Sequence, residues 1–456
     1  MDALEQLSTT IANYAWGPWL LVLLIGGGLY FLARSRFTPY RYLSHALALV
    51  AGRYDESTDP GHVPHRQALA TALAGTIGMG NIAGVAIALQ IAGPGAIFWM
   101  WLTAVVGMAT KFFTCTLAVM YRGKDSQGVL QGGPMYVIRE ALPAKFHFLA
   151  YVFAAVGMIG CLPALQANQL IQAIRELVFV KNGLLEASAD PFAFNLTTGI
   201  VVATIAGLVI FGGIMRIAKI AASIVPFMCG LYVVAALMAI AINIESVPAA
   251  FALIITDAFT GEAVAGGSIL AVILYGVRRG AYSNEAGMGT ESMAHGAAKT
   301  KEPVREGLVA MLGPFVDTLI VCTMTALVIL VAGNPQDGSE GVTMTAEAFG
   351  MLLGPLGEWV VFIVVVCFAA TTIFSYSFYG SQCTSFLFGA HNAHWYRWLF
   401  VSFICVAGVI SMNTAVNIID ASFAIMAIPT MVSAIWLAPR VTEAANIYLS
   451  KLRTET

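Results

Sequence analysis

Residues 75–85 read GTIGMGNIAGV, and they lie within a stretch from Gln67 to Ile91 that holds no charged side chain. Such a stretch predicts a membrane-spanning helix, for which about 20 apolar residues are needed. Its glycines are costly, since glycine is about 1 kcal/mol less favourable than alanine inside a helix, and a bilayer offers no water to freed backbone groups. We therefore predict a helix interrupted at membrane depth, whose freed N–H and C=O groups serve as ligands.

The composition of the whole chain indicates a polytopic membrane protein. Of its 456 residues, 59% are hydrophobic and 11% are charged, against about 25% charged residues in soluble domains. The net charge of −2 and the lack of a basic stripe argue against nucleic-acid binding. The seven cysteines show no CxxC spacing and read as buried thiols. No HExxH, GxSxG or P-loop pattern occurs, so we expect neither an enzyme nor an ATP-driven pump.

Apolar segments of spanning length predict eleven transmembrane helices. They lie at 16–33, 67–92, 96–121, 147–179, 197–213, 217–242, 268–294, 305–332, 355–388, 395–413 and 417–438. Three shorter segments, at 131–141, 246–259 and 343–352, are expected at the membrane interface. The predicted fold class is an all-α polytopic membrane protein.

The distribution of Lys and Arg predicts the orientation. Nearly all of these residues outside the spans fall in alternate loops or in the C-terminal tail, and the opposite loops hold only Arg175 and Lys181. Because cytoplasmic loops carry the excess of basic residues, we expect the N-terminus outside and the C-terminus in the cytoplasm. The expected location is the cell (inner or plasma) membrane.

A second glycine-rich interruption is predicted at Gly276–Gly280, within LYGVRRGAYSNEAGMG (274–289). Each interruption begins a block of five helices, at 67–242 and 268–440, and because five is odd the blocks have opposite orientation. This organisation is a five-plus-five inverted repeat, preceded by one extra N-terminal helix within 1–66. An extracellular connection at 243–267 and a cytoplasmic tail at 441–456 complete the chain. Glycine-interrupted helices at matching positions of inverted halves indicate a transport site at the membrane midplane.

The two interruptions offer ligands for both ends of a zwitterion. The positive end of a helix dipole suits a carboxylate, and we predict that the N–H groups of Met79, Gly80 and Asn81 bind one. Freed carbonyls suit an ammonium group. The candidate carbonyls are those of Gly75, Tyr275 and Val277. The alternative is that these glycines serve only close helix packing.

Two further segments supply polar side chains at membrane depth. Gln166, in LPALQANQLIQ (162–172), is predicted to donate to the substrate carboxylate, although an interhelical hydrogen bond would explain it equally. Thr371 and Thr372 are adjacent hydroxyls in CFAATTIFSYSFYG (367–380). The predicted Na⁺ ligands are the carbonyls of Ala74, Ile77 and Phe368 and the hydroxyls of Thr371 and Thr372. The alternative is that each hydroxyl bonds only to the carbonyl four residues earlier.

Charged residues at membrane depth need partners. These residues are Lys111, Arg278, Arg279, Glu285, Glu291 and Asp317. We expect internal ion pairs that close the cytoplasmic half of a pathway. The alternative is that Glu285 or Asp317 carries a proton.

Several motifs resemble the alanine/glycine:cation symporter family of the amino acid–polyamine–organocation superfamily. They are GTIGMGNIAGVAIALQIAGPGAIFWMW (75–101), QGGPMYVI (131–138), GVRRGAYSNEAGMGT (276–290), AHGAAKT (294–300) and FYGSQC (378–383). The resemblance implies the inverted-repeat fold of the leucine transporter and Na⁺- or H⁺-coupled uptake of alanine or glycine. It also implies a carboxylate site at Met79 and Gly80, with Asn81 beside it. The residues implied to complete the substrate and sodium sites are Gln166, Tyr275, Thr371 and Thr372.

The chain departs from the family pattern at two places. Residues 375–380 read SYSFYG where the family usually has G-W-x-Y-Y-G, so Tyr376 stands in place of Trp beside the substrate. A Tyr leaves more room there and adds a hydroxyl, which makes serine or glutamine a plausible substrate. After SNEAGMG, the family usually has small residues and Pro, where this chain has Thr290, Glu291 and Ser292.

The sequence thus predicts a secondary active transporter that imports a small neutral amino acid with Na⁺ by alternating access. Thr372 and Tyr376 are expected to border the substrate. The rival predictions are coupling to H⁺ in place of Na⁺, and a channel or receptor that does not concentrate its ligand. The expected partners are the amino acid, Na⁺ and the lipid bilayer, with no nucleic acid and no required oligomer.

Overall fold

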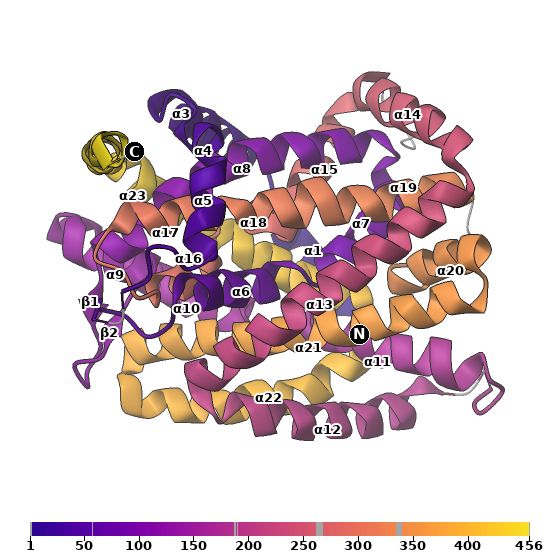
Figure 1. The fold of residues 1–456 in the computed structure, drawn as a ribbon. Coiled ribbons are helices and arrows are strands. Elements are labelled where there is room, and N and C mark those ends of the chain that lie inside the picture. The colour runs from indigo at the N-terminus through magenta and orange to yellow at the C-terminus, as the bar shows by residue number, and fades with distance from the viewer. Residues whose placement is uncertain are drawn as a thin grey trace.

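The computed structural model describes residues 2–56, 58–186, 188, 190–260, 268–333 and 340–455, and these are almost entirely helical (Figure 1). The α-helices are α1 (Asp2–Ala15), α2 (Pro18–Leu21), α3 (Gly27–Arg34), α4 (Thr38–Arg41), α5 (Leu43–Val50), α6 (His65–Thr76), α7 (Met79–Ala92), α8 (Gly95–Met120), α9 (Pro134–Ala141), α10 (Phe148–Gly160), α11 (Ala164–Ala173), α12 (Pro191–Ile210), α13 (Gly213–Ile242), α14 (Val247–Thr260), α15 (Ile269–Asn284), α16 (Thr290–Gly296), α17 (Pro303–Ala310), α18 (Leu312–Pro314), α19 (Thr323–Ala332), α20 (Val342–Leu353), α21 (Pro355–Phe388), α22 (Ala393–Val409) and α23 (Met412–Glu455). The 3₁₀ and π turns are η1 (Val22–Gly26), η2 (Ala144–Phe146), η3 (Ile174–Val180), η4 (Ile244–Ser246), η5 (Phe315–Cys322) and η6 (Ala390–Asn392). Strands β1 (Gly123–Lys124) and β2 (Leu130–Gln131) form one antiparallel pair, with Gly123 opposite Gln131.

Each predicted span overlaps observed helices, but helix length alone does not establish eleven of them. Within the described residues, eight helices are long and apolar enough to cross a membrane, or nine if the pair Thr9–Ala15 and Pro18–Arg34, bent by 44°, is one span. Helices α15 and α22, of 16 and 17 residues, are shorter than those counted. The number eleven and the inverted repeat stay predictions.

The span formed by α6 and α7 lies at the centre of the molecule. Its most apolar window is 100% buried within the protein, whereas that of α12 is 28% buried. A helix that is apolar all round and buried is packed on every side by other helices. The predicted interruption therefore lies among protein side chains, where irregular backbone is tolerated at membrane depth.

The loops rich in Lys and Arg gather at one end of the molecule, which we call the basic end. It contains residues 34–64, 121–146, 297–302 and 440–455. Arg122 joins these loops by donating to the backbone carbonyls of Pro60 (3.1 Å), Gly296 (2.8 Å), Thr300 (3.3 Å) and Ala298. Lys301 pairs with Asp59 at 2.8 Å and thereby lowers the pKa of that carboxyl. Figure 1 shows β1, β2, α9 and the end of α23 there, with α14 and α20 at the opposite end.

Backbone hydrogen bonds also join the segments that precede α6 and follow α16. The N–H groups of His62 and Val63 donate to the carbonyl of Ala297, and that of Lys299 donates to the carbonyl of Val63. Val63 and Ala298 form a parallel β-bridge. The start of α6 and the end of α16 are thus held together at the basic end.

Candidate functional site

The first interruption lies within the predicted stretch. Ile77, with ψ 91°, and Gly78, with φ −150° and ψ −148°, separate α6 from α7. The N–H of Gly78 donates to Oδ1 of Asn81 at 3.0 Å, and the N–H of Asn81 donates to the carbonyl of Gly78 at 3.1 Å. The carbonyls of Ala74 and Ile77 therefore lose the helical partners they would have had four residues on.

The donors at the start of α7 match the prediction only in part. The N–H groups of Met79 and Gly80, in the first turn, have no acceptor within the helix. The N–H of Asn81 already donates to Gly78, so the prediction that it is free for a carboxylate is wrong. The reason is local: the Asn81 side chain and backbone together cap α7.

The amide of Asn81 ties α7 to a buried carboxylate. Its Nδ2 donates to the backbone carbonyl of Asp317 at 3.1 Å and to the carboxylate of the same residue. Oδ2 of Asp317 also accepts from the hydroxyls of Ser283 (2.8 Å) and Thr318 (2.7 Å). All four side chains are fully buried. Asp317 thus lies beside the first interruption, held there by neutral donors.

The second interruption is not where the sequence analysis placed it. Helix α15 continues through Gly276 and Gly280 to Asn284, and the chain breaks over residues 285–289, inside SNEAGMG. There Glu285, Gly287 and Gly289 have φ of 54°, 87° and 88°, a left-handed conformation that interrupts a helix.

Gly276 and Gly280 serve close packing instead. A Cβ on Gly276 would lie 2.5 Å from the carbonyl oxygen of Ala96 in α8, and one on Gly280 would lie 3.0 Å from Cα of Met100. The carbonyls of Tyr275 and Val277 lie inside a continuous helix, where each accepts from the N–H four residues on. The prediction that these two carbonyls are freed is therefore wrong, and the packing alternative holds for this pair of glycines.

The two interrupted helices meet next to the first break. A Cβ on Gly80 would lie 3.0 Å from Cε1 of Tyr282, in the last turn of α15. The hydroxyl of Tyr282 interacts with Gln166, near the start of α11. Among the described residues, Oε1 of Gln166 and Oγ1 of Thr76 are buried atoms without a hydrogen-bond partner. Buried polar atoms are nearly always paired, so each of these two atoms is available to a polar ligand, Thr76 at the first break and Gln166 beside Tyr282.

Thr76 and Tyr282 were not singled out by the sequence analysis. Thr76 is the last residue of α6 and Tyr282 lies three residues before the second break. The signal that would have found them is their position at the two breaks. For Tyr282, that signal depended on locating the second break in SNEAGMG.

Helix α21 places Thr372 beside the first break, and Thr371 precedes it in the same helix. A Cβ on Gly78 would lie 2.5 Å from Oγ1 of Thr372. Both hydroxyls donate within their own helix, Thr371 to Cys367 (2.8 Å) and Thr372 to Phe368 (2.9 Å). The alternative of a bond to the carbonyl four residues earlier is thus realised, yet a hydroxyl that donates keeps lone pairs for a cation.

The same helix carries Tyr376, whose hydroxyl is engaged. It donates to Oε1 of Glu285 at 2.5 Å, and the carboxylate of Glu285 also accepts from the hydroxyl of Thr290. Gly75 lies against α21 as well, since a Cβ there would be 3.2 Å from the ring of Tyr379. The hydroxyl that distinguishes Tyr376 from Trp therefore links α21 to the second break.

The arginine pair does not close the end that the sequence analysis assigned to it. Arg278 pairs with Asp420 of α23 at 2.7 Å, and Arg279 pairs with the same carboxylate. Arg278, Arg279 and Asp420 line a cavity together with Gln90. Gln90 lies in the last turn of α7, at the end of the α6–α7 span that is farthest from His65. The ion pairs thus lie opposite the basic end. Asp420 lies within the predicted span 417–438, but its pairing with the arginines had no local sequence signal, because more than 130 residues separate them in the chain.

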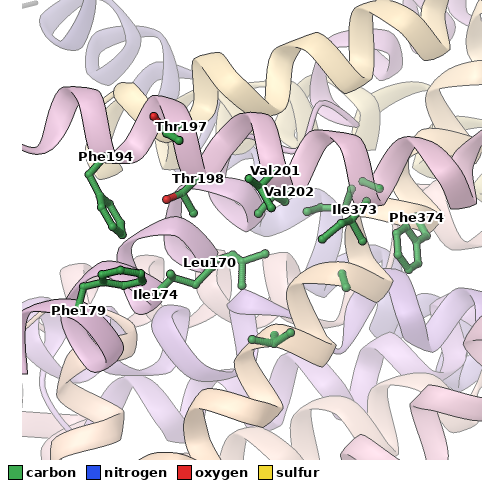
Figure 2. Close-up of a pocket in the computed structure, with 14 residues that line it drawn as sticks. Leu170, Ile174, Phe179, Phe194, Thr197, Thr198, Val201, Val202, Ile373 and Phe374 are labelled. Carbon is green, nitrogen blue, oxygen red and sulfur yellow. The ribbon is translucent and has the colours of Figure 1, made fainter. Parts of the chain in front are cut away.

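An apolar cavity elsewhere in the described residues does not suit a zwitterion. It holds about 550 Å³ between α11, η3, α12 and α21. In Figure 2 the labelled side chains that carry oxygen are Thr197 and Thr198, and Thr197 donates to the carbonyl of Ala193 in its own helix. The candidate site for a zwitterion therefore stays the region between the two breaks.

Comparisons with known proteins identify the family. The model of the "Sodium:alanine symporter family" matches residues 1–456. The chain is 40% identical over 439 residues to "Sodium/alanine symporter AgcS" of Methanococcus maripaludis, covering 95% of this chain and 94% of that protein. It is 34% identical over 392 residues to "Probable sodium/glutamine symporter GlnT" of Bacillus subtilis, covering 84% and 78%.

The crystal structure of MhsT in complex with L-phenylalanine covers 86% of this chain and 99% of its own, with a TM-score of 0.56 and 12% identity. At that identity the likeness shows the fold alone, which is that of the leucine transporter. The family match over the whole length and the relative at 40% identity show more. The chain belongs to the sodium:alanine symporter family, a family of membrane transporters for amino acids and not of enzymes.

Proposed function

We propose that this protein imports a small neutral amino acid, alanine or glycine first, together with Na⁺ by alternating access. The observation that carries the proposal is the meeting of the two interrupted helices at Gly80 and Tyr282. Unpaired oxygens on Thr76, at the end of α6, and on Gln166, which interacts with Tyr282, support it. Interrupted helices that face each other offer donors at one end and acceptors at the other. That combination is complementary to a zwitterion.

The substrate carboxylate would lie on the N–H groups of Met79 and Gly80, with the amide of Gln166 beside them. The ammonium group would face the freed carbonyl of Gly75 and the carbonyls that end α15, at Tyr282 and Ser283. Since Tyr376 donates to Glu285, its hydroxyl is not free to select a polar side chain. This supports alanine or glycine over serine or glutamine, which stay the alternatives.

The ion would bind between the first break and α21. Its ligands would be the carbonyls of Ala74, Ile77 and Phe368 and the hydroxyls of Thr371 and Thr372. A cation there would hold Gly78 against Thr372 and so order the first turn of α7, where the carboxylate binds. The coupling between ion and substrate must be reciprocal.

The wider organisation belongs to the same proposal. It comprises eleven spans, an extra N-terminal helix within 1–66, inverted five-helix blocks at 67–242 and 268–440 joined by 243–267, and a tail at 441–456. The clustering of basic loops at one end supports a cytoplasmic basic end and an outer N-terminus. Nothing in this mechanism requires an oligomer.

Uptake of labelled alanine into proteoliposomes tests the proposal, under an inward Na⁺ gradient or an inward H⁺ gradient at equal membrane potential. We expect accumulation with Na⁺ only. Thr372→Ala should raise the Na⁺ concentration for half-maximal uptake by about tenfold, the effect of roughly 1.4 kcal/mol. Thr384→Ala is the matched control, because that buried hydroxyl also donates to a carbonyl of α21, at 2.8 Å. Equal effects of both substitutions would contradict the sodium site.

Coupling to H⁺ is the second candidate, and the burial of Asp317 beside Asn81 favours it over other rivals. It predicts accumulation under the H⁺ gradient alone and loss of that accumulation in Asp317→Asn. In the sodium mechanism, Thr372→Ala impairs Na⁺ dependence and a H⁺ gradient drives nothing. The two mechanisms therefore give opposite results in the same vesicles.

A further inference from the structure

A polar cavity of about 420 Å³ lies at the end of the molecule opposite the basic end, and we call it the vestibule. Residues of α1, α7, α15 and α23 line it, together with Glu340 before α20. Arg278, Arg279 and Asp420 are among them, and all three are at least nine-tenths buried.

The charges of the three buried residues of the vestibule, Arg278, Arg279 and Asp420, do not balance, and we call these residues its buried layer. Arg278 donates to Oδ2 of Asp420 from Nε (2.8 Å) and pairs with it from Nη2 (2.7 Å), and Arg279 pairs with the same oxygen. Two guanidinium groups thus share one carboxylate oxygen. A buried positive charge without its own anion is costly in a region of low dielectric.

Unpaired atoms point to the same imbalance. Among the described residues, Nε and Nη1 of Arg279 and Oδ1 of Asp420 are buried without a hydrogen-bond partner. Buried polar atoms normally have one. The layer therefore offers donors for an added anionic group and, on Asp420, a spare acceptor.

We infer that the vestibule is an outer binding site for the transported amino acid, with its carboxylate on Arg278 and Arg279 and its ammonium group towards Asp420 and Glu340. The planar guanidinium binds carboxylates in a forked geometry. A halide would satisfy the guanidinium groups but leave both acceptors unused, so a zwitterion fits better. This inference rests on the proposed function, because it names the same substrate at a second site.

Binding in the vestibule would loosen the contact between α15 and α23. The incoming carboxylate competes with Asp420 for Arg279, whose guanidinium lies 5.3 Å from the ring centroid of Tyr282. Tyr282 in turn lies against Gly80 at the proposed substrate site between the two breaks, which we call the inner site. When the substrate carboxylate replaces that of Asp420, the side chains of Arg279 and Tyr282, which separate the vestibule from the inner site, would be freed.

Trp16 provides a local reporter of this event. Its indole N–H donates to the backbone carbonyl of Asp420 at 2.8 Å, and the guanidinium of Arg278 lies 6.0 Å from its ring. The part of the fluorescence change on adding alanine that is missing in Trp16→Phe reports changes around Asp420 and Arg278, in the vestibule. This measurement uses purified protein in lipid nanodiscs and does not depend on transport.

In this assay, Arg278→Gln should raise the alanine concentration for the half-maximal Trp16 signal by at least about tenfold, as the loss of a charge-assisted hydrogen bond implies. Arg278→Lys should restore part of it. Lys181→Gln, which removes a basic residue paired with Glu358 outside the vestibule, should change nothing.

Several results would overturn the inference. Alaninamide, which lacks the carboxylate, should give no Trp16 signal, and an equal signal would contradict the site. A signal that vanishes when gluconate replaces chloride, whatever the amino acid, would show a halide site only. Equal responses of Arg278→Gln and Lys181→Gln would also refute it. Uptake in vesicles separates the two proposals. Failed uptake with an intact Trp16 signal would contradict the proposed function, whereas normal uptake without a Trp16 signal would contradict the outer site.

Discussion

The hydroxyl of Tyr376 is held by the buried carboxylate of Glu285. Tyr376→Phe should therefore lower stability by about 1–3 kcal/mol, the cost of leaving a buried acceptor short of a donor, and it should slow alanine uptake. The preference for alanine over serine should stay unchanged, since the hydroxyl already donates to Glu285. Thermal unfolding and competitive uptake measure both effects.

Tyr396→Phe is the control for this prediction, because its buried hydroxyl donates to the carbonyl of Met158 at 2.8 Å, away from both breaks. It should cost similar stability and leave uptake per folded molecule intact. A change of substrate preference in Tyr376→Phe alone would place the hydroxyl in the substrate site after all.

Single residues differ in how far the sequence predicts their role. The position of Thr372 beside the first break could be predicted, because it follows from which helix must lie next to the interrupted backbone. The partner of Tyr376 could not, because a hydroxyl takes whichever acceptor tertiary packing brings to it. The partner of Arg278 was missed for the same reason, as Asp420 comes from a distant helix.

At the scale of elements, α15 packs against α8 through glycine. Gly276→Ala would place a Cβ 2.5 Å from the carbonyl oxygen of Ala96, and overpacking of this kind costs about 1–3 kcal/mol. We expect a lower unfolding temperature and reduced uptake. Gly230→Ala in α13 is the control, because its Cβ would meet nothing within 4 Å. If the two variants unfold alike, α15 and α8 do not pack as described.

The boundaries of α21 (Pro355–Phe388) match the predicted 355–388, where a Pro begins the helix and a Gly follows it. Those of α23 (Met412–Glu455) do not, since the helix extends well beyond the predicted 417–438 at both ends. The second break was misplaced because glycine has two uses that look alike in a sequence. Gly276 lets helices approach, whereas Gly287 and Gly289 adopt positive φ. The turn-forming residues of SNEAGMG are what distinguish the second use.

For the whole molecule, a buried cluster at the basic end connects three helices. Glu306 of α17 accepts from Nδ1 of His295 in α16 at 2.5 Å and from Nδ1 of His65 in α6. All three side chains are almost fully buried. Because α6 and α16 are the half-helices nearest the basic end, we expect this cluster to hold them together there.

Glu306→Gln should make the basic end open more often, since an amide NH₂ cannot accept from an imidazole N–H. In a chain whose Cys115, buried in α8, is the one remaining cysteine, a thiol reagent should react about tenfold faster, as expected for the loss of a hydrogen bond to a charged group. Glu302→Gln, at a partly exposed side chain 4.0 Å from Lys451, should leave the rate unchanged. Equal rates in both variants would refute the role of the cluster.

The backbone pairing of His62 and Val63 with Ala297 has a consequence for reagents that recognise conformation. The pairing presents two distant segments as one continuous surface at the basic end, and this surface exists only while α6 and α16 are held together. A nanobody that contacts both segments would bind this state alone and shift the population towards it. Such a nanobody would inhibit uptake without touching substrate or ion, and it would serve as an antibody probe for the closed basic end in native membranes.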